Sequence, residues 1–212
     1  MRKGRFIAFE GGDGCGKGTQ MQIAAEYVFK LNKEYDILLT REPTRDFKEI
    51  RKRMAQGNDV RKDSRWYAKM FVADRKNHCE NYIKPNLERG TDVFCDRFKH
   101  STLAYQHTQG MDLKELIKMH EGILVPDTTL IFDCPAEVAY ERRKNDGAID
   151  VFDKDLKFQQ ELRLNYLRLR NELPDERIII IDATKSIEEV ATVVKAELDM
   201  MYFADLTPKE EH

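Results

Sequence analysis

A glycine-rich stretch near the start of the chain has the residue types and the spacing of a phosphate-binding loop. It reads EGGDGCGKGTQ over residues 10–20. The positions that match the pattern G-x-x-x-x-G-K are Gly11, Gly16 and Lys17. In such a loop, backbone N–H groups surround phosphate oxygens and the lysine neutralises the β- and γ-phosphates. Gly18 stands where a hydroxyl residue would bind magnesium. The stretch is therefore either a nucleotide loop without that ligand or a glycine-rich turn that imitates one.

Two arginines could hold a second phosphate group. Arg41 and Arg97 each follow a short apolar run of strand length. The planar guanidinium group can donate two parallel hydrogen bonds, so arginine is better suited than lysine to hold a phosphorylated acceptor. For Arg41, a surface ion pair with Glu42 or Asp46 is the alternative. Asp96 precedes Arg97 and could help water and phosphate oxygens to hold magnesium.

An aromatic and a cationic side chain share one face of an expected helix. Phe71 and Arg75 are four residues apart, which places them on the same side of a helix. The ring of Phe71 could stack on a nucleobase while Arg75 reaches its carbonyl oxygen. Core packing is the usual fate of a helical phenylalanine, and the spacing alone favours that alternative.

Short apolar runs alternate with longer charged stretches and indicate the elements that would position these residues. The runs cover 6–10, 36–40, 92–96, 129–133 and 178–182. Their continuous hydrophobicity is typical of strands buried on both faces of a parallel sheet. Helices are expected over 18–32, 64–88, 112–120, 135–145, 154–171 and 186–201. The pattern predicts an α/β protein with one doubly wound sheet, whose ligands bind beyond the carboxyl ends of the strands. Acids that end these runs could cap the next loop or belong to a site: Glu10, Asp96, Asp133 and Asp182.

The composition argues against several classes of protein. A chain of 212 residues, 41% of them hydrophobic, can form one α/β domain with a sizeable core. A formal charge of -2, without a basic patch that includes aromatic residues, gives no support for nucleic-acid binding. No segment approaches the ~20 apolar residues of a membrane span. The cysteines are far apart in the sequence, which argues against zinc or a disulfide framework and for reduced thiols in the cytosol. They are Cys15, Cys79, Cys95 and Cys134.

Several longer stretches resemble the thymidylate kinase family, and together they cover nearly the whole chain in order. They are TREPT (40–44), MFVADR (70–75), DRFKHSTLAYQ (96–106), VPDTTLIFDCPAEVAYER (125–142) and IIIIDATKSIEEV (178–190). The resemblance implies transfer of the γ-phosphoryl group of ATP to dTMP, with Mg²⁺ as cofactor, in a cytoplasmic homodimer. It also implies a three-layer P-loop kinase fold with five parallel strands in the order 2-3-1-4-5. One domain would cover 1–204 with a lid near 142–153, and 205–212 would form a polar tail.

The resemblance implies roles for individual residues. Those expected to bind ATP are Gly11, Gly12, Asp13, Gly14, Cys15, Gly16, Lys17, Gly18, Thr19, Thr184 and Lys185. Those expected to bind dTMP are Asp13, Arg41, Phe71, Arg75, Arg97, Ser101, Thr102, Tyr105 and Gln106. Asp13 would contact the 3′-hydroxyl group of the sugar, and Tyr105 would crowd its 2′ side. The expected catalytic residues are Lys17, Asp96 and Arg97, with Arg142 or Arg143 as the lid cation. Asp96 would also contact the metal.

The chain departs from the family pattern in the phosphate loop and in the lid. Residues 12–15 include no basic residue, and Asp146 and Val151 stand where members without a loop arginine carry lid arginines. Two alternatives therefore stay open: a kinase for another pyrimidine monophosphate such as dUMP or UMP, and a nucleotide-binding protein without turnover. The presence of Lys17 and Arg97 argues against the second alternative, because a protein that only binds a nucleotide needs no contact to a second phosphate group.

Overall fold

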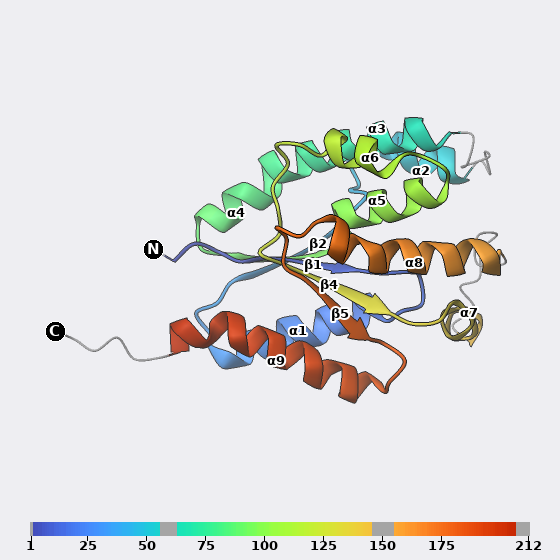
Figure 1. Ribbon diagram of the computed structural model, residues 1–212. Helices are drawn as coiled ribbons and strands as arrows, with labels where there is room; N and C mark the ends of the chain where they lie inside the picture. The colour runs from blue at the N-terminus through green and yellow to red at the C-terminus, as the bar shows by residue number, and fades with distance from the viewer. Residues whose placement is uncertain (1, 56–62, 146–154, 207–212) are drawn as a thin grey trace.

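The protein is built on a parallel sheet whose strands all end at one edge (Figure 1). The computed structural model describes residues 2–55, 63–145 and 155–206. The strands are β1 (Phe6–Glu10), β2 (Ile37–Arg41), β3 (Asp92–Asp96), β4 (Thr128–Asp133) and β5 (Ile178–Asp182). Their order, β2-β3-β1-β4-β5, confirms the predicted fold, and each strand begins and ends within one residue of its predicted range.

Helices follow the strands and form the crossovers between them. They are α1 (Lys17–Leu31), α2 (Lys48–Ala55), α3 (Ser64–His78), η1 (Cys79–Ile83), α4 (Lys84–Glu88), α5 (Lys99–Thr108), α6 (Leu113–Met119), α7 (Ala136–Asn145), α8 (Leu156–Glu172) and α9 (Ile187–Leu206). The helix predicted over 64–88 is formed by α3, the π-helical turn η1 and α4 in direct succession. No helix within 2–55, 63–145 and 155–206 is long and apolar enough to cross a membrane.

Helices cover both faces of the sheet, and the alternation of side chains along β1 shows why. Ile7 and Phe9 belong to a core cluster with residues of α1 and α9 on one face. Phe6 and Ala8 point the other way, into a cluster with residues of α3, η1 and α4. All four side chains are buried, which agrees with the continuous apolar run in the sequence. Figure 1 shows the resulting three layers, with α1 and α9 below the sheet and α3, α4, α5 and α8 above it.

Two helices and one helix end differ from the prediction. Helix α5 lacks a local side-chain cap; its first N–H groups donate to Glu10, 88 residues earlier in the chain than Phe98. Helix α2 is short and polar, and its Ile50 is fully buried. Helix α5 buries polar as well as apolar side chains, so neither helix has a clear apolar periodicity. Helix α9 continues through Asp205 and Leu206, which were predicted to lie in the tail.

Candidate active site

Glycines curl the chain between β1 and α1 into a tight loop. Gly11, Gly14 and Gly16 have φ angles of 130°, 84° and 82°, which residues with a Cβ atom rarely adopt. A Cβ atom on Gly14 would lie only 2.5 Å from the carbonyl oxygen of Ala139 in α7. Helix α1 begins at Lys17, directly after this loop, so its N-terminal N–H groups add to those of the loop. The arrangement is suited to an anion such as a nucleotide phosphate.

Lys17 is buried and its ammonium group points back to the loop. Nζ donates to the carbonyl oxygen of Gly12 at 2.7 Å and lies 3.9 Å from Oδ1 of Asp13. Burial, together with the charge of Arg97, lowers the pKa of Lys17 from its ordinary value. Binding of an anion here would stabilise the ammonium form.

Four further residues expected to contact ATP are exposed. Gly18 and Thr19 lie in the first turn of α1, and a side chain at position 18 would meet open space. Thr184 follows β5, and its N–H and hydroxyl groups both donate to Oδ1 of Asp182. The acid at the end of β5 therefore caps the following turn, as one of the two alternatives for it predicted, and Lys185 lies beside it in the exposed turn.

Arg97 lies at the carboxyl end of β3 and contacts the phosphate loop. Its φ angle of 69° is uncommon for a residue with a side chain, and such strain is found mainly at functional sites. Its guanidinium group has polar contacts with Oδ1 of Asp13 (2.5 Å), Oγ of Ser101 (3.1 Å), the hydroxyl groups of Tyr166 (3.2 Å) and Tyr105 (3.4 Å), and the carbonyl oxygen of Gly11 (3.4 Å). These contacts fix the guanidinium group beside the loop.

Asp13 brings several cations together. Besides Arg97, its carboxylate contacts the hydroxyl group of Tyr105 at 3.0 Å and lies 3.9 Å from both Lys17 and Arg143. Burial opposes ionisation of Asp13, but the charges of Arg97 and Lys17 outweigh it and hold its pKa well below the usual range. One carboxylate thus faces three cations. The excess of positive charge favours a further anion at this place.

Asp96 has one carboxylate oxygen engaged and one available. Its Oδ2 accepts a hydrogen bond from Arg41 at 3.2 Å. The ion-pair partner of Arg41 is therefore Asp96, whereas the alternative drawn from the sequence was Glu42 or Asp46. Its Oδ1 is buried and has no hydrogen-bond partner among the described residues. A buried carboxylate oxygen without a partner is suited to accept from a water bound to Mg²⁺. Within the described ranges no group of three or more His, Cys, Asp or Glu residues could hold a metal by itself.

Arg75 lies in a buried polar network. It forms an ion pair with Glu42 at 2.6 Å, and it contacts Nε2 of His120 at 2.7 Å and the hydroxyl group of Thr102 at 3.2 Å. Burial, with the charge of Arg75 adding to it, lowers the pKa of His120 to about 3. The neutral ring donates from Nδ1 to the carbonyl oxygen of Leu116 and so presents Nε2 as an acceptor to the guanidinium group. The network holds Arg75 in one orientation.

Two further residues expected at the nucleobase have different surroundings. Phe71 is partly buried, and its ring stacks on that of Tyr67 with centroids 6.0 Å apart. Gln106 is only 2% exposed, and its Oε1 has no partner among the described residues. A buried acceptor of this kind costs stability unless a donor reaches it, and a bound ligand could supply that donor.

The two candidate lid cations lie on α7 and have different partners. Arg142 donates to the carbonyl oxygen of Ala183 at 2.8 Å, whereas Arg143 approaches Asp13 and the phosphate loop. Arg143 is therefore the better placed of the two to meet a phosphate. The rest of the expected lid, residues 146–153, lies outside the described residues.

Comparison with known proteins gives the family. The thymidylate kinase family model matches residues 9–194. The chain belongs to the thymidylate kinase family. A Pyrococcus abyssi protein named "Probable thymidylate kinase" is 36% identical over 205 residues, which are 92% of this chain and 98% of that protein. The thymidylate kinase of Caulobacter vibrioides is 37% identical over 201 residues, covering 92% of this chain and 95% of that enzyme. The crystal structure of thymidylate kinase from Ehrlichia chaffeensis superposes with a TM-score of 0.74 at 30% identity and covers 93% of this chain and 99% of that one.

Several residues of this thymidylate kinase family member contact the expected site without having been expected there. Glu10 is fully buried, accepts from both the N–H and the hydroxyl group of Ser101, and so positions a neighbour of Arg97. Tyr166 reaches the same arginine from α8, and His120 contacts Arg75. Glu10 was noted as an acid at the end of a strand, with its role open. The other two come from distant parts of the sequence, with no local motif to mark them.

Proposed function

We propose that this chain transfers the γ-phosphoryl group of ATP to dTMP, giving dTDP and ADP. Membership of the thymidylate kinase family supports the reaction. The observation that carries the proposal is the convergence of Lys17, Arg97 and Arg143 on Asp13. Phosphoryl transfer requires in-line positioning and neutralisation of the charge on the moving group, and it needs no covalent intermediate. Cations from the loop, from the end of β3 and from α7 supply that neutralisation.

ATP binds with its phosphates in the loop. Backbone N–H groups of residues 11–19 surround the phosphate oxygens, and Lys17 leaves the carbonyl oxygen of Gly12 to contact the β- and γ-phosphates. Thr184 and Lys185 contact the nucleotide from the turn after β5. Arg143 neutralises charge on the moving phosphoryl group, because α7 already holds it near the loop.

The acceptor dTMP binds between β3, α3 and α5. Arg41 and Arg97 hold its phosphate, for which Arg97 exchanges part of its contact with Asp13. Asp13 contacts the 3′-hydroxyl group, and Tyr105 disfavours a 2′-hydroxyl group. The thymine base stacks on Phe71, and the residues available to its polar edge are Arg75, Ser101, Thr102 and Gln106.

Magnesium is the proposed cofactor, and the donor set fits it. The unpartnered Oδ1 of Asp96 can accept from a metal-bound water, and Mg²⁺ in nucleotide sites keeps several waters and binds phosphate oxygens. Because position 18 is a glycine, no side-chain hydroxyl group is offered there. When bound, the metal supplies additional positive charge to the β- and γ-phosphates.

The setting of the enzyme follows from the same family membership. We propose one P-loop kinase domain that extends to the end of α9 at Leu206, two residues beyond the expected 1–204, with a lid near 142–153. A homodimer in the cytoplasm is the proposed assembly and location.

The test is an acceptor panel. Purified protein is incubated with MgATP and dTMP, dUMP or UMP, and ADP and the diphosphate products are separated and counted. The proposal predicts a clear preference for dTMP, with ADP and dTDP formed in equal amounts. Equal or higher turnover with UMP contradicts the assigned acceptor, and no turnover with any of the three contradicts the enzyme. Lys17→Met should abolish turnover and leave the unfolding transition in place.

A further inference from the structure

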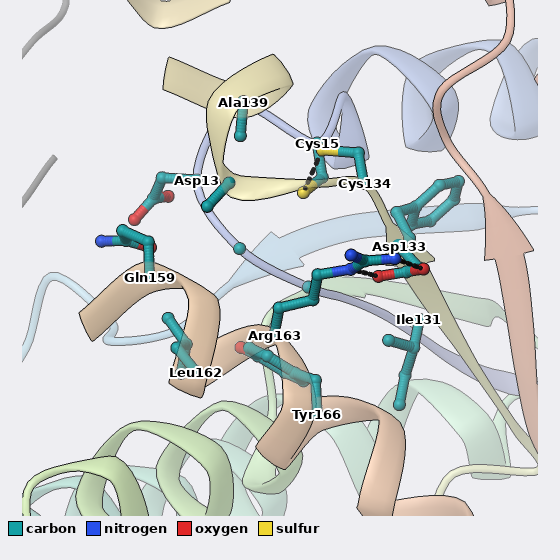
Figure 2. Close-up of a pocket in the computed structure, with 14 residues that line it drawn as sticks. Asp13, Cys15, Ile131, Asp133, Cys134, Ala139, Gln159, Leu162, Arg163 and Tyr166 are labelled. Carbon is teal, nitrogen blue, oxygen red and sulfur yellow. Dashed lines mark hydrogen bonds and ion pairs between the residues drawn. The ribbon is translucent and has the colours of Figure 1, made fainter. Parts of the chain in front are cut away.

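Two cysteines that are distant in the sequence lie side by side at the phosphate loop. Cys15 belongs to the loop, and Cys134 follows the last residue of β4. Their Sγ atoms are 3.0 Å apart, and both side chains are buried (Figure 2). A disulfide bond needs about 2.05 Å between the sulfur atoms, so the two are about 1 Å from bonding distance. They are 119 positions apart in the sequence, and this spacing gave no indication of a pair.

The surroundings of this pair differ from those of the other two cysteines. A hydrogen bond with Cys134, and then the charge of Lys17, lower the pKa of Cys15 from its ordinary value although the thiol is buried. Burial instead raises the pKa of Cys79 to about 12 and that of Cys95 well above its ordinary value. The thiolate is the reactive form of cysteine, so Cys15 is the thiol best suited to react.

Both cysteines line a small cavity. It has a volume of about 20 Å³ and is lined by the loop, the end of β4, α7 and α8. One water needs roughly 10–15 Å³ of such volume, so the cavity can hold a reagent slightly larger than water, such as hydrogen peroxide. Figure 2 shows Cys15 and Cys134 on one wall of this cavity, with Arg163 and Asp133 paired nearby.

We propose that Cys15 and Cys134 form a modification site at which a hydroperoxide converts two thiols into a disulfide that ties the phosphate loop to the end of β4. In its effect on turnover this inference rests on the proposed function. The Cys15 thiolate attacks one oxygen of hydrogen peroxide, the O–O bond breaks, and hydroxide leaves, which makes Cys15 a sulfenic acid. The sulfur of Cys134 then attacks that of Cys15, its proton joins the departing hydroxyl group as water, and the S–S bond forms. The thiols lose two electrons and two protons in total, and the peroxide becomes two waters.

The disulfide shifts the backbone of the loop because the loop is already tightly packed. The sulfur atoms must move together by about 1 Å, while the backbone at Gly14 already lies against Ala139. Cys15 lies between Gly14 and Gly16, whose N–H groups belong to the proposed phosphate-binding loop. A shift of about 1 Å in a positioning element can lower a rate by ~10²-fold. We expect the oxidised protein to lose at least about tenfold in both MgATP affinity and turnover.

The modification can be measured without any assay of activity. Reduced protein is treated with hydrogen peroxide, its remaining thiols are alkylated under denaturing conditions, and the peptides are analysed by mass spectrometry. We expect a linked Cys15–Cys134 peptide pair with a mass loss of two hydrogens, which dithiothreitol reverses. Cys79 and Cys95 should remain alkylated. Oxidation of Cys79 or Cys95 at the same rate as the pair, or sulfinic acid at Cys15 without a link, overturns the site.

The consequence is tested with matched variants. Cys134→Ala should keep the basal binding of a fluorescent ATP analogue but lose peroxide sensitivity by at least about tenfold in rate, whereas Cys79→Ala should stay as sensitive as wild type. A disulfide that forms without lowering nucleotide binding overturns the proposed effect on the loop. If the disulfide forms and binding falls in a protein that phosphorylates no acceptor, only the kinase proposal fails. Disulfide mapping on wild-type protein keeps the site testable even if Cys134→Ala does not fold.

Discussion

His120 should make the folded protein sensitive to mild acid by an amount that follows from its burial. In the folded chain its pKa is lowered to about 3, whereas a histidine in an unfolded chain has a pKa near 6.5. Between these values the unfolded chain binds a proton that the folded chain does not, so stability falls as the pH falls. From pH 7 to pH 5 this one group should lower the free energy of unfolding by about 2 kcal/mol. The result hardly changes if the folded pKa is one unit higher, because the ring still stays neutral at pH 5.

The assay is urea unfolding of wild type and His120→Gln at pH 7 and pH 5. Glutamine does not titrate, and it can still offer an oxygen to Arg75 and an N–H group to Leu116, so the cost of the substitution itself is read at pH 7. The fall in unfolding free energy between the two pH values should be smaller in the variant by about 2 kcal/mol. An equal fall in both proteins would refute the reasoning, since His120 would then be protonated in the folded state as easily as in the unfolded one.

Two substitutions test the packing around the loop. Gly14→Ala places a Cβ atom 2.5 Å from the carbonyl oxygen of Ala139, so MgATP binding, measured by nucleotide titration, should fall by more than tenfold. Gly110→Ala is the control, because Gly110 also has a positive φ but faces open space. It should cost ~1–2 kcal/mol of stability in urea unfolding and leave nucleotide binding unchanged. Glu10→Gln replaces a buried carboxylate that accepts from the N–H and hydroxyl groups of Ser101. The substitution should lower the free energy of unfolding by about 2 kcal/mol. A loss below ~0.5 kcal/mol would mean that the carboxylate does not stabilise the start of α5.

The strands were predictable because their information is local, whereas their order was implied by the resemblance to the thymidylate kinase family. A strand buried on both faces shows as a continuous apolar run, and each run here begins or ends with an acidic residue. The phosphate loop was equally accessible, because its glycines and Lys17 form one contiguous motif between a strand and a helix. The helix start after Gly16 follows from the same motif.

Contacts between distant segments could not be predicted from the sequence. The cap on α5 comes from Glu10, and the sulfur atom next to that of Cys15 belongs to Cys134. Whether such residues meet depends on strand register and on the path of the loops, which no single segment specifies. The positive φ of Arg97 is a similar case, because the surrounding structure imposes it against the preference of the residue.

The most direct test of the assigned site is the rate of dTDP formation by Arg97→Lys at saturating MgATP. Lysine keeps the charge, but it cannot reproduce the planar group that contacts Asp13 and Ser101 beside the loop. The variant should lose about 10²–10³-fold in kcat/KM for dTMP. Arg177→Lys is the matched control, since Arg177 precedes β5, at the opposite end of the strands from the phosphate loop, and pairs with Glu197; it should stay within a few-fold of wild type. Equal rates for wild type and Arg97→Lys would contradict the proposed position of the acceptor phosphate.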